Sequence, residues 1–386
     1  MNLTPPLSSK LSIRVSANPR KIRDCPFSGG WGKQKPVWSV IQGSTTMPIS
    51  PPNFTVVKNW AAVPAFLSFP EIPDVAVDSR DRLHVFSRYP NVISVFEKDG
   101  SYAGSWGQGR FAKAHGLYID AEDNLFVTDV GAHTVQKYTM EGELLMTLGT
   151  PFGPSDSGIR FGASPVTRAA GPFNCPTHIT IGPDDDIYVT DGYANARVHR
   201  FSADGTHKAS WGEPGNGPGQ FNIPHGLAFD SRGRLYIADR ENSRIQVFTG
   251  DGELLDIWDF PNRPNKIIID SEDRLYISEI GYRTNRDLGP NGEPHFHWPH
   301  FRLMAEPPPG HDWEARVSVC NTDGQVIATI GDEYGVAPGN ILAPHGLALD
   351  SRGNLFIGET PVDGGAYEVY APDRMLTIQK FQRVAP

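Results

Sequence analysis

The sequence is poor in cysteine, and this limits how the chain can be stabilised and where it works. Its 386 residues include three cysteines, Cys25, Cys175 and Cys320, and none of them forms a Cys-x-x-Cys pair. Cysteines this far apart predict neither a disulfide framework nor a zinc site built from thiolates. Such usage is typical of a reducing compartment, so we expect a cytoplasmic protein.

Runs of positive charge and long apolar stretches are also missing. The formal net charge is −9, and no cluster of lysine and arginine is long enough to neutralise a nucleic-acid backbone. Residues 1–21 contain basic side chains without the continuous apolar core of a secretory signal, and no stretch has the length of a membrane span. We therefore expect neither nucleic acid nor a membrane as a partner.

What the chain has instead is glycine, proline and an internal repeat. It contains 40 glycines and 34 prolines, and a pair of apolar strands around an acidic turn recurs along it. The six copies are PDVAVDSRDRLHVFSR (73–88), AHGLYIDAEDNLFVTD (114–129), PTHITIGPDDDIYVTD (176–191), PHGLAFDSRGRLYIAD (224–239), PNKIIIDSEDRLYISE (264–279) and PHGLALDSRGNLFIGE (344–359). Further alternating stretches follow the copies. Six four-stranded units predict an all-β fold, a six-bladed β-propeller, because a closed ring shelters the edges of its sheets.

The spacing of the copies resembles NHL repeats and covers residues 53–386. AYEVY (366–370) is the expected third strand of the last blade. Either NFTVVKNW (53–60) or MLTIQKFQR (375–383) could be its outer strand, and the sequence does not decide between them.

Three segments lie outside the regular repeats. Residues 1–52, rich in proline, serine and glycine, are expected to form an extended or partly disordered arm. The insertions 150–175 and 280–312 open on the same face and have the length of lids or binding elements. Tyr282 and Arg283, at the base of the second insertion, are expected to face a substrate pocket there.

The topology of a propeller gathers certain residues at one mouth of its channel, because the first strand of each blade starts there and the second returns there. Just before the first strands stand Asp74, His115, His178, His225, Asn265 and His345. His115, His225 and His345 come from alternate blades, and three neutral imidazoles with an open fourth position suit a catalytic zinc ion. Alternatively, each imidazole binds a carbonyl group at the start of its strand. His178 is open to three roles: a fourth ligand, a support for a ligand, or a channel residue that contacts substrate or solvent.

The loops after the second strands add polar groups to the same mouth. VTDGYANARV places Tyr193 there, IADRENSRI places Arg240, and FSRYPN places Arg88. A tyrosine beside a cation and a metal ion favours the phenolate, which can act as a general base. The two arginines suit a carboxylate or an oxyanion. The alternative for either arginine is a surface salt bridge with an acid such as Asp239 or Glu241.

The stretches HGLYIDAEDNLFVTDVGAHTVQKY (115–138), VTDGYANARV (189–198) and PHGLAFDSRGRLYIADRENSRIQVF (224–248) resemble the peptidyl-α-hydroxyglycine α-amidating lyase family, and the resemblance covers the propeller. It implies that His115, His225 and His345 bind zinc, that Tyr193 is the base, and that Arg88 and Arg240 line the site. The reaction of that family breaks the C–N bond of a carbinolamide and releases an amide and glyoxylate.

The chain also departs from this family. The family has a methionine two residues before the last histidine, where this chain has Ala343, and its structural calcium uses an acidic residue directly after that histidine, where this chain has Gly346. The family has a disulfide in the third blade, and here it would need a cysteine at position 194 to pair with Cys175, where this chain has Ala194. An acidic residue is expected where this chain has His178. The resemblance therefore does not extend to the calcium ion or the disulfide.

These observations lead to one hypothesis and two alternatives. The hypothesis is a metal-dependent lyase, with zinc or another divalent transition metal, that cleaves a small α-hydroxy amide bearing a carboxylate. The first alternative is a hydrolase or hydratase that uses the same metal to activate water. The second is a non-catalytic NHL scaffold, whose binding residues would lie on a rim of charge or exposed aromatics.

Overall fold

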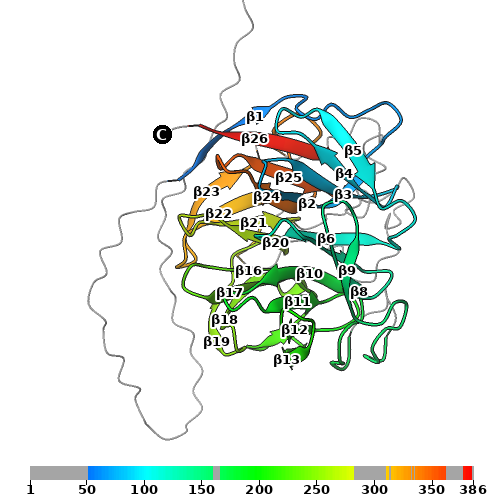
Figure 1. The fold of residues 1–386 in the computed structure, drawn as a ribbon. Coiled ribbons are helices and arrows are strands. Elements are labelled where there is room, and N and C mark those ends of the chain that lie inside the picture. The colour runs from blue at the N-terminus through cyan, green and yellow to red at the C-terminus, as the bar shows by residue number, and fades with distance from the viewer. Residues whose placement is uncertain are drawn as a thin grey trace, which may run out of the picture.

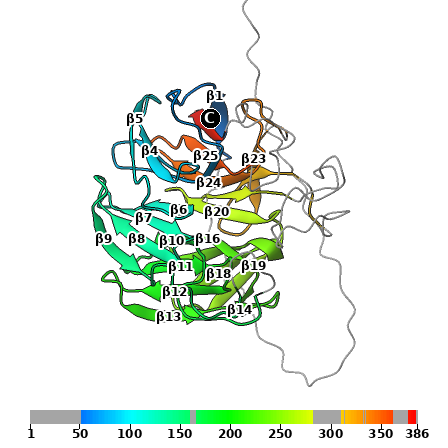
Figure 2. The ribbon, with the colours of Figure 1, turned by 90° about the vertical axis from the view of Figure 1, so that its right-hand side faces the viewer.

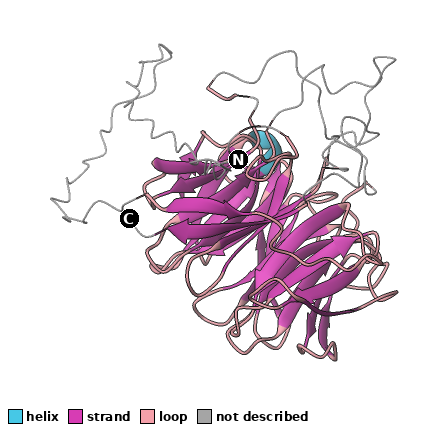
Figure 3. Ribbon diagram, turned by 90° about the horizontal axis from the view of Figure 1, so that it is seen from above, coloured by secondary structure: helices cyan, strands magenta, loops and turns pink. Residues whose placement is uncertain are grey.

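The computed structural model describes residues 51–159, 166–281, 310–312, 314–331, 333, 335–361 and 377–384 of the chain. Their strands form six four-stranded antiparallel sheets and one short two-stranded sheet. Six four-stranded sheets around a common axis make a six-bladed β-propeller, so the predicted fold class is confirmed. Figure 3 shows that strands make up almost all of the regular structure.

The strands of each blade run from the axis to the rim. Blade one is β2 (Glu71–Val77), β3 (Leu83–Arg88), β4 (Val92–Phe96) and β5 (Tyr102–Trp106); blade two is β6 (Ala114–Ile119), β7 (Leu125–Asp129), β8 (Thr134–Tyr138) and β9 (Leu144–Leu148); blade three is β10 (Pro176–Ile181), β11 (Ile187–Asp191), β12 (Arg197–Phe201) and β13 (His207–Trp211). Blade four is β16 (Pro224–Phe229), β17 (Arg234–Asp239), β18 (Arg244–Thr249) and β19 (Leu254–Trp258); blade five is β20 (Pro264–Ile269), β21 (Leu275–Glu279), β22 (Arg316–Cys320) and β23 (Val326–Ile330); blade six is β24 (Pro344–Leu349), β25 (Leu355–Glu359), β26 (Ile378–Val384) and β1 (Asn53–Val57).

The remaining elements are short. β14 (Glu213–Pro214) and β15 (Gln220–Phe221) form a parallel pair, and η1 (Arg240–Asn242) is a single turn of 3-10 helix. Within the ranges given above, no helix is long and apolar enough to cross a membrane.

The innermost strands of all six blades meet in the middle of the molecule (Figure 1). These strands are β2, β6, β10, β16, β20 and β24, while β5, β13 and β19 lie toward the rim. Residues that face the axis from the innermost strands therefore converge, although they are far apart in the sequence.

The acidic turn after each innermost strand explains why the repeat folds this way. In five blades an aspartate carboxylate accepts hydrogen bonds from backbone N–H groups two and four residues further on; these aspartates are Asp78, Asp120, Asp230, Asp270 and Asp350. Each turn then needs one residue in the left-handed region, and aspartate or glycine supplies it at Asp81, Asp123, Asp185, Gly233, Asp273 and Gly353. The repeated turn chemistry sets the register of strands one and two.

The hydrophobic core is divided among the interfaces between blades. Each of six clusters of buried apolar side chains joins two neighbouring blades. In one of them Phe86 of blade one packs with Leu117 and Val127 of blade two. Burying both faces of every sheet in this way holds the ring together.

The ring closes with strands from both ends of the chain. β1 pairs with β26, and β26 pairs with β25, so β26 is the third strand of blade six and β1 is its outer strand. Figures 1 and 2 show these two strands side by side. NFTVVKNW is therefore the outer strand that the sequence left undecided. The assignment of AYEVY as the third strand was wrong, because β26 occupies that position, and residues 366–370 lie outside the described residues.

Candidate metal centre and active site

Three buried histidines meet on the axis of the propeller. His115 on β6, His225 on β16 and His345 on β24 each offer a ring nitrogen, and these nitrogens lie within 4.8 Å of one another. The side chains are 1%, 2% and 7% exposed, respectively. The expectation that alternate blades bring these residues together is confirmed in its geometry.

A bulge and an acidic brace place each histidine. The register of each innermost strand shifts beside the histidine, and a bulge of this kind re-aims the side chain it carries. The acid that ends the second strand accepts hydrogen bonds from the backbone just ahead of the histidine, and these acids are Asp129, Asp239 and Glu359. These carboxylates therefore brace the backbone that leads into each histidine.

The second ring nitrogen of each histidine fixes its orientation. Nδ1 donates to a main-chain carbonyl of the next blade: His115 to Thr177 at 2.6 Å, His225 to Asn265 at 3.2 Å, and His345 to Pro73 at 2.6 Å. A proton on Nδ1 leaves the lone pair of Nε2 free to bind a metal ion. The alternative that each imidazole binds a carbonyl group is therefore compatible with a ligand role, because different nitrogens are used.

The electrostatics keep the imidazoles neutral. Burial, followed by His345 and Arg88, holds the pKa of His115 well below its usual value. Burial, followed by Arg240 and His345, does the same for the pKa of His225. Burial and Arg88 lower the pKa of His345 to about 3. Metal ligands must be deprotonated, so these residues are already in the form that a metal ion needs.

The donor set fits a divalent transition metal ion. Three imidazole nitrogens with one position left for water or substrate are the ligands of many catalytic zinc sites. His115, His225 and His345 provide this set, with one ring nitrogen each within 4.8 Å of the other two.

Tyr193 lies against this centre. Its hydroxyl Oη is 3.0 Å from Nε2 of His115 and 3.3 Å from Nε2 of His225. Nη1 of Arg240 donates a hydrogen bond of 3.2 Å to the same oxygen. The oxygen of Tyr193 is thus shared between the nitrogens that would hold the metal ion and a permanent positive charge.

Both predicted arginines are buried beside carboxylates. Arg240 donates from Nε to Glu241 at 2.9 Å, and Glu241 also receives Nη2 of Arg263 at 2.7 Å. Arg88 donates from Nη1 to Glu71 at 3.0 Å and from Nε to the carbonyl oxygen of Ala114 at 2.9 Å. These are buried ion pairs and not the surface salt bridges of the alternative.

Two of these partners were not identified from the sequence. Glu71 lies opposite Arg88 in the pairing of β2 with β3, within blade one. Arg263 lies just before β20 and contacts Glu241 from 22 residues away. Glu241 follows Arg240 directly and is one of the acids that the sequence offered as its partner.

The described part of the first insertion supports the loop that carries Tyr193. Ser157 donates from Oγ to the carbonyl oxygen of Ala194 at 2.5 Å, and the backbone N–H of Ala194 donates to the carbonyl oxygen of Asn174 at 3.2 Å. Cys175 is a free, buried thiol in the same apolar cluster as Tyr193 and Ala194. Packing and hydrogen bonds therefore hold this loop where the related family has a disulfide.

The register of β10 corrects the position of His178. His178 lies opposite Thr190 in blade three, and Gly346 lies opposite Gly358 at the equivalent position of blade six. His178 therefore corresponds to Gly346 and is one residue further along its strand than the three central histidines. Its Nε2 is 3.0 Å from Oδ2 of Asp74, which is shifted in the same way. His178 therefore lies in the next layer of the channel, and its predicted contact with substrate stays a prediction.

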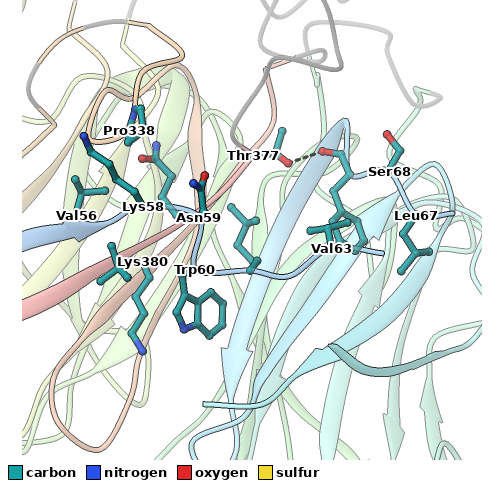
Figure 4. A pocket seen from close by; sticks show the side chains of 15 residues that line it. Val56, Lys58, Asn59, Trp60, Val63, Leu67, Ser68, Pro338, Thr377 and Lys380 are labelled. Carbon is teal, nitrogen blue, oxygen red and sulfur yellow. Dashed lines mark hydrogen bonds between the residues drawn. The ribbon is translucent and has the colours of Figure 1, made fainter. Parts of the chain in front are cut away.

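Tyr282 and Arg283 lie outside the described residues, as does most of the insertion 280–312. A pocket opens between β1, β26 and the segment before β2, with Lys58, Trp60 and Lys380 in its wall (Figure 4). It is lined by none of the predicted site residues, so we do not assign it to the histidine centre.

Known proteins similar to this chain include NHL-repeat proteins and peptide-amidating proteins. The NHL repeat family matches residues 111–138, 173–201 and 221–248, in blades two, three and four. NHL repeat-containing protein 3 of Homo sapiens is 34% identical over 231 residues, 53% of this chain and 63% of that protein. Peptidyl-glycine alpha-amidating monooxygenase B of Xenopus laevis is 40% identical over 266 residues, 66% of this chain and 26% of that protein. The probable peptidyl-alpha-hydroxyglycine alpha-amidating lyase pgal-1 of Caenorhabditis elegans is 31% identical over 181 residues, 46% of this chain and 45% of that protein.

The chain spans less than two thirds of the length of each of these relatives. Among solved structures, a streptogramin B lyase has a TM-score of 0.52 at 16% identity, over 86% of this chain and 98% of that one, which is a likeness of fold. The repeats, the order of the blades and these matches show an NHL-repeat β-propeller that is similar to the peptidyl-α-hydroxyglycine α-amidating lyases.

Proposed function

We propose that the chain is a zinc-dependent lyase that cleaves the C–N bond of a small α-hydroxy amide bearing a carboxylate. One observation carries the proposal: Tyr193 Oη lies 3.0 Å and 3.3 Å from the inward nitrogens of His115 and His225. A candidate base thus stands within reach of an oxygen atom bound at the histidine centre. Relatives named as amidating lyases support the same chemistry.

Different residues of the chain have different roles in the proposed reaction. A zinc ion held by the three histidines would act as a Lewis acid on the substrate hydroxyl and lower its pKa. Tyr193 takes the proton of that hydroxyl. A carbonyl group forms as the C–N bond breaks, the bonding electrons leave with the amide nitrogen, and the proton passes from Tyr193 to that nitrogen. The products are a primary amide and glyoxylate, and neither an oxidant nor water is consumed.

The two arginines supply binding and orientation. The positive charges of Arg88 and Arg240 both lower the pKa of His115, and that of Arg240 lowers the pKa of His225. A carboxylate of the substrate is held between such cations by charge-assisted hydrogen bonds. Since Arg240 also donates to Tyr193, it links the carboxylate to the base.

Metal analysis and one substrate test this proposal. Purified protein is expected to carry about one zinc or similar ion per chain. The triple variant His115→Ala, His225→Ala, His345→Ala should lose it, while His207→Ala, at an exposed histidine on β13, should keep it. Protein expressed in metal-replete medium that holds no ion would overturn both enzymatic functions.

The products then separate the candidate reactions. With α-hydroxyhippurate, a lyase releases benzamide and glyoxylate in equal amounts, whereas a hydrolase that attacks the amide carbonyl releases benzoate. A blank without protein gives the spontaneous rate. Benzoate as the main product would replace the lyase by the hydrolase.

A non-catalytic role is the second candidate function. The relative named NHL repeat-containing protein 3 is matched over more of its length than the amidating proteins are. A scaffold predicts a metal-free chain that releases no glyoxylate above the blank, and the same two measurements therefore decide between a scaffold and an enzyme.

A further inference from the structure

A second ring of side chains lies next to the three histidines in the channel. It contains Asp74 from blade one, His178 from blade three and Lys266 from blade five, each one residue beyond the position of a central histidine. In blades two, four and six this second position is a glycine: Gly116, Gly226 and Gly346. Blades with a histidine and glycine thus alternate with blades that bring a charged or polar side chain to the second ring.

The ammonium group of Lys266 is held by oxygen atoms from two other blades. Nζ donates to Oδ1 of Asp74 at 2.5 Å, to the carbonyl oxygen of Val75 at 3.3 Å and to the carbonyl oxygen of Leu117 at 3.3 Å. The side chain is 8% exposed and that of Asp74 is 1% exposed. One carboxylate and two main-chain carbonyl groups are the kind of ligands that a hard cation such as Ca²⁺ takes.

The carboxylate of Asp74 is fully engaged. Besides Lys266, it accepts hydrogen bonds from the backbone N–H groups of Leu117 at 2.6 Å and Val75 at 2.9 Å. Nε2 of His178 lies 3.0 Å from its Oδ2. Burial opposes ionisation, but Lys266 and His178 outweigh it and the pKa of Asp74 is lowered.

A calcium ion does not fit this ring. The related family supplies an acidic ligand directly after the last histidine, and this chain has Gly346 there. A Cβ on Gly346 would lie 2.6 Å from Cα and 2.9 Å from Oδ1 of Asp74, so no side chain can enter from that position. The carboxylate that is present comes from Asp74, and Nζ of Lys266 already contacts it at 2.5 Å.

We propose that Lys266 is a built-in cation that takes the place of a metal ion in the second ring. It binds β2 through Val75 and Asp74 and β6 through Leu117, and it thereby joins blades one, two and five across the channel. Pro73, which precedes Asp74, accepts the hydrogen bond of His345, and His115 is two residues before Leu117. The cation thus positions two of the three histidines, and it does so whether or not these hold zinc.

The wild-type chain gives the first test. Its melting temperature should be the same in EGTA and in millimolar CaCl₂ at equal ionic strength, and it should contain no calcium after purification. A rise in melting temperature with calcium, or calcium retained at about one ion per chain, would overturn the proposal.

Removing the ammonium group gives the second test. Lys266→Ser should lower the melting temperature in EGTA by about 5 °C or more, because it leaves a buried carboxylate without its cation. Calcium should restore at least half of this loss, since the oxygen ligands remain and the space is open. Lys208→Ser is the matched control: Lys208 also binds an aspartate, Asp186 at 2.6 Å, but it is 45% exposed. It should lose little and should not respond to calcium.

Other results would count against the proposal. An unchanged melting temperature for Lys266→Ser would mean that the cation holds nothing together. A loss that calcium does not restore would make the contact an ordinary buried ion pair and not a cation site. If Lys266→Ser does not fold, the same measurement on Lys266→Gln, which keeps most of the side chain, applies. Each readout is a melting temperature or a calcium content, so failure of the proposed lyase activity is seen separately.

Discussion

The guanidinium group of Arg240 lies over the ring of Tyr193 and donates a hydrogen bond of 3.2 Å to its hydroxyl oxygen, with 5.2 Å between Cζ and the ring centroid. The same oxygen reaches two of the three central histidines. A hydrogen-bond donor with a fixed positive charge stabilises negative charge on the oxygen that it contacts. The contact therefore couples the candidate base to the candidate carboxylate-binding residue.

Tyr193→Phe should separate catalysis from metal binding. The substitution removes only Oη, so glyoxylate release from α-hydroxyhippurate should fall by about 10²–10⁴-fold, the usual contribution of a general base. The zinc content should stay at the wild-type level because the three imidazoles keep their carbonyl contacts. Activity and bound zinc are measured on the same preparation.

Tyr188→Phe is the control for this experiment. Tyr188, on β11, is buried and donates to the carbonyl oxygen of Gly250, in the turn after β18, at 3.1 Å. It should keep wild-type activity. Equal activity in the Tyr193 variant would remove that residue as the base, and loss of zinc would make its role structural.

Glu241→Gln should weaken substrate binding, because Glu241 positions Arg240. Glu241 accepts from Nε of Arg240 at 2.9 Å and from Nη2 of Arg263 at 2.7 Å, so a neutral amide leaves two buried cations without their shared anion. Misplacing Arg240 should reduce kcat/KM about tenfold, mainly by raising KM. Steady-state kinetics with α-hydroxyhippurate and the melting temperature are measured together.

The control for this variant is Glu253→Gln, at an exposed position in an outer turn. It should leave both KM and kcat unchanged. A Glu241→Gln enzyme that melts earlier but has the KM of the wild type would show that Glu241 stabilises the fold and does not position Arg240.

The blades and the three histidines were predictable because the same sequence pattern recurs in several blades. Five of the six turns have the bracing aspartate, and all six have an aspartate or glycine in the left-handed region, so the turns mark the strands in every copy. His115, His225 and His345 share the sequence His-Gly-Leu, and identical motifs on alternate blades must converge on the axis.

The position of His178 depended on one residue of register. The proline that opens β10 is two residues before His178, whereas the proline that opens β16 is one residue before His225. Aligning the prolines would have placed Thr177 level with His225, and His178 level with Gly226. The bulge at the start of each innermost strand hid this offset, because it changes which residue faces the axis.

Contacts between blades were not predictable from one sequence. Lys266 of blade five and Asp74 of blade one are 192 residues apart. Spacing along the chain contains no trace of such pairs. Ring closure by β1 and β26 was undecided for a similar reason, since both stretches alternate and only packing orders them.

Gly226→Ala should distort the histidine centre through the neighbouring strand β20. A Cβ at this position would lie 2.3 Å from the carbonyl oxygen of Asn265 and 2.7 Å from Cα of Lys266, and both are backbone atoms. Asn265 O accepts the hydrogen bond of His225, so the strain is transmitted to a metal ligand. We expect a loss of about 1–3 kcal/mol in the free energy of unfolding and a lower zinc content.

Gly171→Ala is the matched control, because a Cβ there meets no atom within 4 Å. Chemical unfolding and metal analysis of both variants test the prediction. Equal stability and zinc content in Gly226→Ala and the wild type would mean that β20 moves to accommodate the added methyl group. The close contact between Gly226 and β20 would then not be needed for zinc binding.

Acid should destabilise the metal-stripped protein because its central histidines resist protonation. Burial and Arg88 lower the pKa of His345 to about 3, whereas histidine in an unfolded chain titrates near 6.5. Between these values the unfolded chain binds a proton that the folded chain does not, so the free energy of unfolding falls as the pH falls below about 6.5. At pH 5 the loss from His345 alone amounts to about 2 kcal/mol.

The pH dependence of unfolding identifies the residue responsible. Denaturant unfolding of EDTA-treated protein between about pH 7.5 and pH 5 should give a smaller slope against pH for His345→Gln than for the wild type, because glutamine does not bind a proton. His207→Gln, at an exposed histidine on β13, should keep the wild-type slope. If His345→Gln and the wild type have the same slope, His345 must be able to take up a proton in the folded protein. A proton would then compete with the metal ion for the imidazole nitrogen, and zinc binding would weaken near neutral pH instead of persisting to about pH 5.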